Sequence, residues 1–337
     1  MGGNSFGKIL VLTTFGESHG SCTGGVLDGF PADFPIDLHF IQSELNRRAP
    51  GFGNFSSPRK EEDRIEILSG VFEGKTTGAP IAFIIPNKDH RSEDYSAVKD
   101  LFRPSHADYA WEKKFGHRDY RGGGRISARE TAARVAGGAF ARLFLNSKGI
   151  KIKAVVCEIG RFKLPSEETA ANEYLMALKE AGDTAGGIIQ CVMSGLPAGL
   201  GEPVFDKLQA GLARAMISIN AVKGFEYGSG FEGARMKGSE HNDSFIVSAD
   251  GSVGTSTNFS GGIQGGISNG MPVEFRVAFK PVSSIMQPQE TIDKQGRPVQ
   301  YTGSGRHDVC VVPRAVPIVE AMAALVIADH MLMRGEQ

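Results

Sequence analysis

The stretch Asp119–Ala139, DYRGGGRISARETAARVAGGA, joins three adjacent glycines to the clearest helix signal in the chain. Ser127 and Glu130 have the S-x-x-E spacing of a helix capping box, in which each side chain bonds to the other residue's backbone N–H. The apolar periodicity then predicts a helix over Ser127–Asn146. Small residues recur four positions apart on it, so one face can pack closely against another backbone or a flat cofactor. These residues are Ala133, Gly137 and Ala141.

The same stretch is also the strongest candidate for anion binding. A helix N-terminus offers free backbone N–H groups, and guanidinium groups add paired donors for a phosphate or carboxylate. The alternative is a turn followed by a solvated basic helix face. The arginines concerned are Arg121, Arg125, Arg129 and Arg134.

The composition indicates an ordinary globular protein. The 337 residues are 41% hydrophobic and 22% charged, and the formal net charge of −1 favours neither nucleic acid nor a membrane surface as a partner. The four cysteines form no C-x-x-C pair, which fits a reducing cytoplasm, and no histidine spacing predicts a metal centre. The apolar segment Val316–Met333 carries Glu320, Asp329 and His330, so we expect a buried core helix rather than a membrane span. The N-terminal apolar run is too short for a signal peptide.

The remaining elements follow from apolar periodicity and turn residues. Met271–Lys280 alternates apolar and polar residues, which is typical of a half-buried antiparallel strand. Other strands are predicted over Lys8–Thr14, Arg64–Phe72, Ala79–Ile85, Lys151–Ile159 and Gly187–Ser194. Helices are predicted over Leu38–Arg48, Ala107–Phe115, Ser166–Ala181, Pro203–Ile217 and Ala315–Met333. Because there is neither a clear linker nor a regular βαβ alternation, we expect residues 1–337 to form one α+β domain.

Two short motifs resemble well-known sites but lack the required context. GESHG, Gly16–Gly20, matches the G-x-S-x-G of hydrolases, yet glycines and a proline follow Ser18 where a nucleophile elbow needs a helix. GVFEGKT, Gly70–Thr76, has three residues between its glycines where a P-loop has four, so we expect a turn there.

Histidines and cations recur in loops bounded by glycine or proline. His19, His106 and His307 are candidates for acid–base work, and Asp308 for a base or charge partner. Each of the basic residues taken alone is best read as a surface charge. If they converge on one cleft, they predict a site for a small polyanion. They are Arg47, Arg48, Arg59, Lys60, Arg103, Lys280 and Arg306.

The ordered set of motifs resembles the chorismate synthase family over nearly the whole chain. GESHG stands near the N-terminus, YRGGGRISARETAARVAGGA in the middle, and GRHD with RAVPIVEAM near the C-terminus. Between them, in the family's order, come FRPSHADY, SINAVKG, GGIQGGISNG and KPVSS.

This resemblance implies a carbon–oxygen lyase of the shikimate pathway, which leads to the aromatic amino acids. Such an enzyme carries out an anti-1,4-elimination of phosphate from 5-enolpyruvylshikimate 3-phosphate to give chorismate. It also implies dependence on reduced FMN, with NADPH only an indirect reductant through an external flavin reductase. The implied fold is a β-α-β sandwich of antiparallel sheets and helices, and the implied assembly is a cytoplasmic homotetramer.

The resemblance further implies a role for each matched residue. His19 would protonate the leaving phosphate, and His106 would stabilise the reduced flavin. Asp308, with Ser18 and Ser127 nearby, would relay a proton at flavin N5, which accepts the substrate's C6 hydrogen. Arg48, Arg129 and Arg134 would hold the substrate's anionic groups. The FMN-binding positions would be Arg125, Ile126, Ser127, Asn220, Ala221, Gly265, Lys280, Pro281, Val282, Ser283, Ser284 and Arg306.

Two positions depart from the family pattern, and two other functions stay open. Many members have serine where Ile126 stands and arginine where Asn54 stands. One alternative is a flavin-dependent oxidoreductase on the same scaffold, which would consume NADPH at every turnover. The other is a non-catalytic polyanion-binding module, against which the loop histidines and Asp308 argue.

Overall fold

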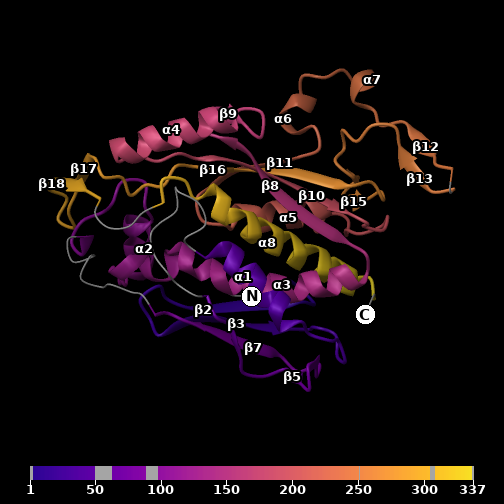
Figure 1. The fold of residues 1–337 in the computed structure, drawn as a ribbon, viewed down its shortest axis with the longest axis horizontal. Coiled ribbons are helices and arrows are strands. Elements are labelled where there is room, and N and C mark those ends of the chain that lie inside the picture. Colours follow the sequence, from indigo (N-terminus) through magenta and orange to yellow (C-terminus); the bar gives the residue numbers. More distant parts are fainter. Residues whose placement is uncertain (1–2, 50–62, 89–97, 250, 304–307, 336–337) are drawn as a thin grey trace.

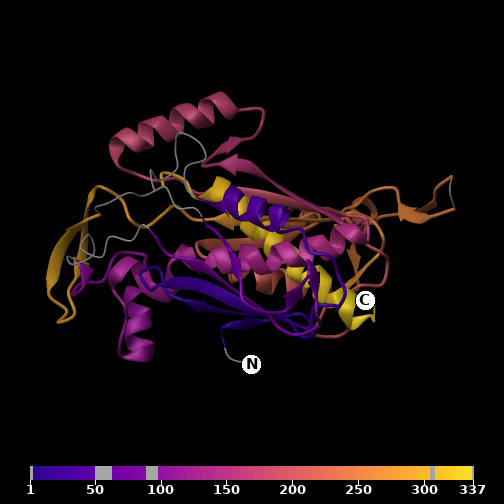
Figure 2. The same cartoon turned by 60° about the horizontal axis from the view of Figure 1, so that its bottom comes forward.

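Two antiparallel sheets enclose a layer of helices in the computed structural model (Figure 1, Figure 2). The structure describes residues 3–49, 63–88, 98–249, 251–303 and 308–335. The first sheet has the order β1 (Ser5–Phe6), β2 (Val11–Gly16), β3 (Cys22–Asp28), β7 (Ile81–Pro86), β4 (Glu66–Ile67). The second has the order β11 (Val222–Tyr227), β16 (Val273–Phe279), β10 (Gly187–Ser194), β8 (Lys151–Ile159), β9 (Phe162–Lys163). The predicted α+β class and sandwich arrangement are confirmed.

The helix layer contains α1 (Leu38–Arg48), α3 (Thr131–Ser147), α5 (Leu208–Ile217) and α8 (Val312–Met333). α3 contacts β2 and β3 of one sheet, while α8 contacts β8 and β10 of the other, so the two helices tie the sheets together. Among the described residues, α8 alone is long and apolar enough to cross a membrane, and 83% of its most apolar window is buried inside the protein. α8 is therefore a core helix, as predicted.

The small residues of α3 pack against protein rather than against an open cavity. A Cβ on Gly138 would lie 2.4 Å from the Cβ of Ala321 in α8. On the neighbouring face, a Cβ on Gly137 would lie 2.8 Å from the side chain of Leu12 in β2. Glycine at these two positions lets α3 approach both a helix and a sheet closely.

The other elements lie around this sandwich. α4 (Glu168–Ala181) lies beside β9 at the edge of the second sheet, and α2 (Asp108–Phe115) lies beside the hairpin β17 (Pro288–Ile292)–β18 (Pro298–Thr302) (Figure 1). An arm projects from the opposite end (Figure 1). It contains α6 (Gly230–Gly233), α7 (Gly238–His241), β12 (Phe245–Val247) and β13 (Val253–Thr255), while the hairpin β14 (Ile263–Gln264)–β15 (Ile267–Ser268) lies against the body at its base.

Several predicted boundaries are correct and others are wrong for identifiable reasons. α1, β8 and β10 begin and end where the sequence predicts. The strand predicted over Arg64–Phe72 is interrupted at Gly70, whose φ of +80° turns the chain into the short hairpin β5 (Val71–Phe72)–β6 (Lys75–Thr76). The helix predicted over Pro203–Ile217 begins only at Leu208.

The start of the central helix also differs from the capping-box prediction. Two short 3₁₀ segments, η2 (Arg121–Ile126) and η3 (Ala128–Glu130), precede α3. Ser127 caps η3 by accepting from the Arg129 N–H at 3.4 Å. Glu130 pairs with Arg134 at 2.7 Å instead of reaching back to Ser127, so the reciprocal bond of a capping box is absent.

Candidate active site

The three glycines of η2 separate two of the predicted histidines. Gly122, Gly123 and Gly124 have φ of +58°, +83° and +55°, a left-handed run that other residues rarely adopt. A Cβ on Gly122 would lie 2.0 Å from Cε1 of His19, and one on Gly123 would lie 3.6 Å from Cε1 of His106. The glycines therefore let one loop pass between both imidazoles.

A cavity of about 320 Å³ opens beside this loop. The end of α1, the start of α3, the segments after α5 and β16, and the start of α8 form its walls. Ten of the predicted site residues line it together: Arg48, His106, Ile126, Asn220, Ala221, Lys280, Pro281, Val282, Ser283 and Asp308.

Two polar side chains of this cavity are placed to bind a ligand. Asn220 donates its Nδ2 hydrogen to the Ile126 carbonyl at 3.0 Å, and its Oδ1 is buried with no hydrogen-bond partner among the described residues. Lys280 Nζ donates to the Ser105 carbonyl at 2.9 Å and forms no ion pair with a described carboxylate. Burial lowers the pKa of Lys280, and the nearby charge of Lys223 lowers it further. A planar ligand with polar edges and an anionic group fits these features.

Backbone strain also concentrates at this cavity. Ser105 and Ala221 both line it, and both are non-glycine residues with positive φ, +54° and +67° respectively. Such conformations cost free energy and persist where the surrounding structure requires them, which is common at ligand sites. Both residues bind Lys280 through their backbone carbonyls. The Ser105 carbonyl accepts from Lys280 Nζ, and the Ala221 carbonyl accepts from the Lys280 backbone N–H, each at 2.9 Å.

Asp308 is held by an arginine that the sequence analysis did not assign. Arg314, in the first turn of α8, pairs with the Asp308 carboxylate at 2.6 Å and donates its Nε hydrogen to the Arg48 carbonyl at 3.2 Å. Burial lowers the pKa of Arg314, which Asp308 partly offsets. Arg314 is the first residue of the RAVPIVEAM motif. The sequence signal for its role was a charged residue at the start of an otherwise apolar helix.

Asp63 links two of the predicted substrate arginines. It is fully buried and accepts hydrogen bonds from both Arg48 and Arg129. Burial alone would raise the pKa of Asp63, but the charges and hydrogen bonds of the two arginines hold it below its ordinary value. Arg48 reaches the cavity, whereas Arg129 lies behind it and donates to Asn87 Oδ1 at 2.8 Å. No motif pointed to Asp63.

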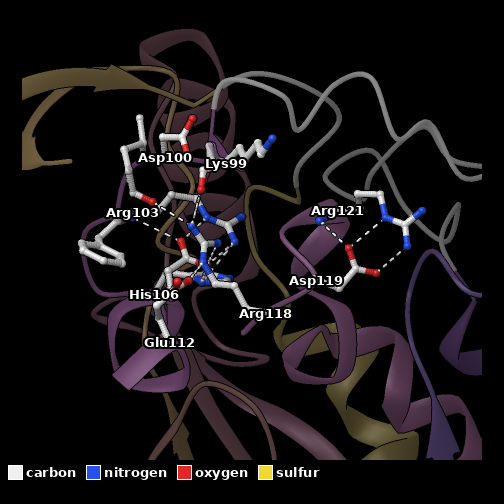
Figure 3. A network of polar contacts seen from close by, with 12 residues as sticks. Lys99, Asp100, Arg103, His106, Glu112, Arg118, Asp119 and Arg121 are labelled. Carbon is white, nitrogen blue, oxygen red and sulfur yellow. Dashed lines mark hydrogen bonds and ion pairs between the residues drawn. The ribbon is translucent and has the colours of Figure 1, made fainter. Parts of the chain in front are cut away.

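His106 belongs to a network of buried charges (Figure 3). Its Nδ1 lies 3.0 Å from Asp108 Oδ1 and 3.2 Å from Arg103 Nη2. Asp108 also pairs with Arg103 at 2.7 Å and with Arg118 at 3.1 Å. Burial would raise the pKa of Asp108, but these hydrogen bonds and charges lower it well below its usual range. Because Nδ1 faces the carboxylate, the opposite edge of the imidazole points toward Gly123.

His19 lies in the loop between β2 and β3, so no helix follows Ser18. Ser18 Oγ lies 3.2 Å from His19 Nδ1, and the backbone N–H of Ser18 donates to the Gly124 carbonyl at 3.3 Å. Asn87 Nδ2 donates to the carbonyls of Glu17 and Gly20, both at 2.9 Å, and so connects this loop to Arg129. The GESHG segment is therefore not a nucleophile elbow, as expected.

Not every predicted residue reaches the cavity. The side chains of Arg125 and Arg134 line a second cavity, because they project from the opposite side of the segment that presents Ile126 and Thr131. Gly265 lines a third cavity, between α5, β11 and the base of the arm. Ser127 caps η3, and Ser284 is buried next to the lining residue Ser283. Arg306, His307, Arg59, Lys60 and Asn54 lie outside the described residues.

Comparisons with known proteins agree on one family. The family model described as chorismate synthase matches residues 10–332. A chorismate synthase of Christiangramia forsetii is 56% identical over 353 residues, which cover 98% of either chain. One of Cytophaga hutchinsonii is 55% identical over 350 residues, covering 98% of this chain and 97% of the relative. A crystal structure of a chorismate synthase superposes with a TM-score of 0.77 at 33% identity, covering 97% of this chain and 93% of the other.

Proposed function

Since this chain belongs to the chorismate synthase family of carbon–oxygen lyases, we propose that it converts 5-enolpyruvylshikimate 3-phosphate to chorismate and phosphate. In this proposal the reaction is an anti-1,4-elimination that depends on reduced FMN and forms the last step of the shikimate pathway. The observation that carries it is the single cavity shared by Arg48, His106 and Asp308 with the expected flavin-side residues.

Several residues of the cavity lining fit FMN. The buried, unpartnered Oδ1 of Asn220 can accept from a flavin ring N–H. Lys280, without a described carboxylate partner, can neutralise part of an anionic tail, and Ser283 lies beside it in the lining. Ile126 and Ile318 offer apolar surface to a planar ring. When bound, reduced FMN would supply an electron-rich ring that assists loss of phosphate and takes part in transfer of the substrate's hydrogen.

Cations on the cavity wall and behind it suit the departing phosphate. The elimination breaks one C–H and one C–O bond without net redox change, and the phosphate leaves more easily when it is protonated or paired with cations. We assign Arg48 and Arg129, both oriented by Asp63, to hold the anionic groups of the substrate. His19, linked to Arg129 through Asn87, is assigned to donate the proton.

His106 and Asp308, on the cavity wall, are assigned to hold or transfer protons. The network of Asp108 and Arg103 holds the imidazole of His106 in one orientation, and we assign its second nitrogen, on the edge toward Gly123, to act on the bound flavin. Asp308, fixed by Arg314, provides a carboxylate that can hold or pass a proton.

The wider setting of the enzyme is part of the same proposal. Exposed aromatic and aliphatic side chains on the arm, such as Phe231, Phe245 and Val247, are what an interface between copies would cover, and they support the proposed homotetramer. The proposed location is the cytoplasm. FMN would be reduced by an external flavin reductase at the expense of NADPH, since the chain lacks large insertions relative to the family pattern.

An anaerobic assay tests the reaction. Purified protein, chemically reduced FMN and 5-enolpyruvylshikimate 3-phosphate should yield chorismate and phosphate in equal amounts, with no NADPH present. Product should keep forming after many turnovers of each flavin, because the flavin is not consumed. Absence of product under these conditions would reject the proposal. In a parallel assay with NADPH added, consumption of one NADPH per turnover would instead establish the oxidoreductase. Binding of polyanions without turnover in either assay would establish the binding module.

A further inference from the structure

A second cavity, of about 360 Å³, lies across the Arg125–Thr131 segment from the first. Ile126, Ala128 and Thr131 face the first cavity, whereas Arg125 and Glu130 face the second. We propose that this second cavity binds a small phosphate-bearing anion at a site separate from that of the elimination. The inference rests on the cavity alone and does not require the proposed reaction.

The charge in this cavity is unbalanced. Three guanidinium groups line it, those of Arg125, Arg134 and Arg214, but Glu130 is the only carboxylate among the described residues of its lining. Glu130 pairs with Arg134 at 2.7 Å, and Arg214 forms no ion pair within the described part of the chain. Two positive charges therefore remain, which matches the charge of a phosphate dianion.

Arg125 provides the second observation. Its Nε and Nη2 are held by Asn4 Oδ1 at 3.3 and 3.2 Å, and Nη2 also donates to the Thr14 carbonyl at 2.7 Å. Its remaining nitrogen, Nη1, is buried with no hydrogen-bond partner among the described residues. Buried N–H donors in native proteins nearly always have a hydrogen-bond acceptor, and an oxygen of a bound anion would be one for Nη1. Burial lowers the pKa of Arg125, and the charge of Arg134 lowers it further despite the opposing effect of Glu130.

The rest of the lining favours a phosphate with a small organic body. Arg134 Nη1 donates to Ser218 Oγ at 2.7 Å, which fixes a second guanidinium at the rim. Arg214 lies over the ring of Phe6, 5.3 Å from its centroid, so its planar fork is also held in place. Trp111 and Leu12 add apolar surface that inorganic phosphate alone would leave uncovered.

The chain supplies its own reporter for this cavity, because Trp111 is the single tryptophan in the sequence. Tryptophan fluorescence should change saturably as inorganic phosphate is added, and phenyl phosphate should give a lower midpoint if the apolar wall takes part. The Arg214→Ala and Arg214→Glu variants should raise the midpoint at least ~10-fold, because the exposed Arg214 can be changed without disturbing the core. Equal midpoints for the two anions would identify inorganic phosphate as the ligand.

Two variants serve as controls. Arg235→Ala removes an exposed arginine that pairs with Glu232 on the arm, and Lys280→Ala alters the first cavity. Neither should move the midpoint reported by Trp111. The proposal is overturned if potassium chloride at equal ionic strength produces the same change, if no saturable change occurs, or if Arg214→Ala leaves the midpoint where it is in the unaltered protein. A protein that fails the elimination assay can still pass this test, so the two proposals fail independently.

Discussion

The orientation of His106 depends on one buried carboxylate. Asp108 contacts the imidazole and two guanidinium groups, and its own side chain is 1% exposed. Holding the Nδ1 edge of a histidine fixes which nitrogen can act on a ligand, so Asp108 is a positioning residue for the chemistry we assign to His106.

Replacing Asp108 by Asn should lower kcat at least ~10-fold in protein that remains folded, because the amide cannot orient the imidazole in the same way. It should also lower the free energy of unfolding by about 3 kcal/mol, since two buried guanidiniums lose their counter-charge. Steady-state kinetics and denaturant titration would measure the two effects. Asp100→Asn, at a mostly exposed carboxylate 3.9 Å from Lys294, is the matched control and should change neither. An unchanged kcat in folded Asp108→Asn protein would remove the positioning role.

Single residues also mark where sequence reasoning succeeded and where it could not. The runs Asn220–Ala221 and Lys280–Ser283 were recognisable because whole loop segments, with their order, matched a family. Asp63 and Asp108 were not recognisable, since their importance comes from partners brought together only by the fold. Arg134 was assigned to the substrate by its motif, but motif position does not tell which side of a helix start faces the cavity.

At the scale of elements, the close crossing of α3 and α8 sets the position of the site. The first residue of α3, Thr131, lines the cavity, and so does Arg314 of α8. The distance between the two helices therefore sets how far apart these two parts of the cavity wall lie. Gly138 permits this crossing, because any side chain there would meet the Ala321 backbone at 2.5 Å.

Gly138→Ala should therefore destabilise the protein by about 1–3 kcal/mol, in spite of alanine's better helix propensity. Gly211→Ala in α5 is the control: its added Cβ would have ordinary contacts, 3.4 Å from Val326, so it should be neutral or stabilising by up to about 1 kcal/mol. Thermal denaturation of both variants measures the difference. If Gly138→Ala were as stable as Gly211→Ala, the crossing would not be tight in solution.

Helices and strands were predicted best where the apolar pattern extended over many residues, and worst where glycines interrupted that pattern. α1, β8 and β10 carried clear patterns and were located correctly. β3 was missed because its glycines read as a loop, although they are there for close packing. A Cβ on Gly24 would lie 2.5 Å from the Phe83 carbonyl of the neighbouring strand β7. The capping box was wrong because Arg134 competes for Glu130, a contact that a motif search does not weigh.

At the scale of the molecule, buried ion pairs join distant segments and make the fold sensitive to acid. Asp63 joins Arg48 of α1 to Arg129 before α3, and its pKa lies below the ordinary value of 3.8. A carboxyl whose folded pKa is lowered contributes its full stability above the unfolded pKa and loses it as pH falls through the folded value. This contribution should thus disappear progressively below about pH 4.

Asp63→Asn should be less stable than the unaltered protein at pH 7, because two buried guanidiniums lose their partner. Its stability should also fall less steeply between pH 5 and pH 3, since no proton is taken up at this position. Urea titrations across that range would measure both slopes, with the exposed Asp100→Asn as control. Parallel slopes for Asp63→Asn and the unaltered protein would show that Asp63 does not contribute to acid unfolding.

The cavity itself is a property of the whole chain, since Arg48, Asn220, Lys280 and Asp308 come from four segments far apart in sequence.

Binding of FMN to this cavity is the central claim, and flavin fluorescence measures it directly. The unaltered protein should bind FMN in the presence of substrate. Asn220→Ala should weaken binding at least ~10-fold, about 1.4 kcal/mol. Asn269→Ala, at another asparagine with one buried unpartnered amide atom but outside this cavity, should bind as the unaltered protein does. Equal affinities for the two variants, or no FMN binding by any of them, would contradict the account.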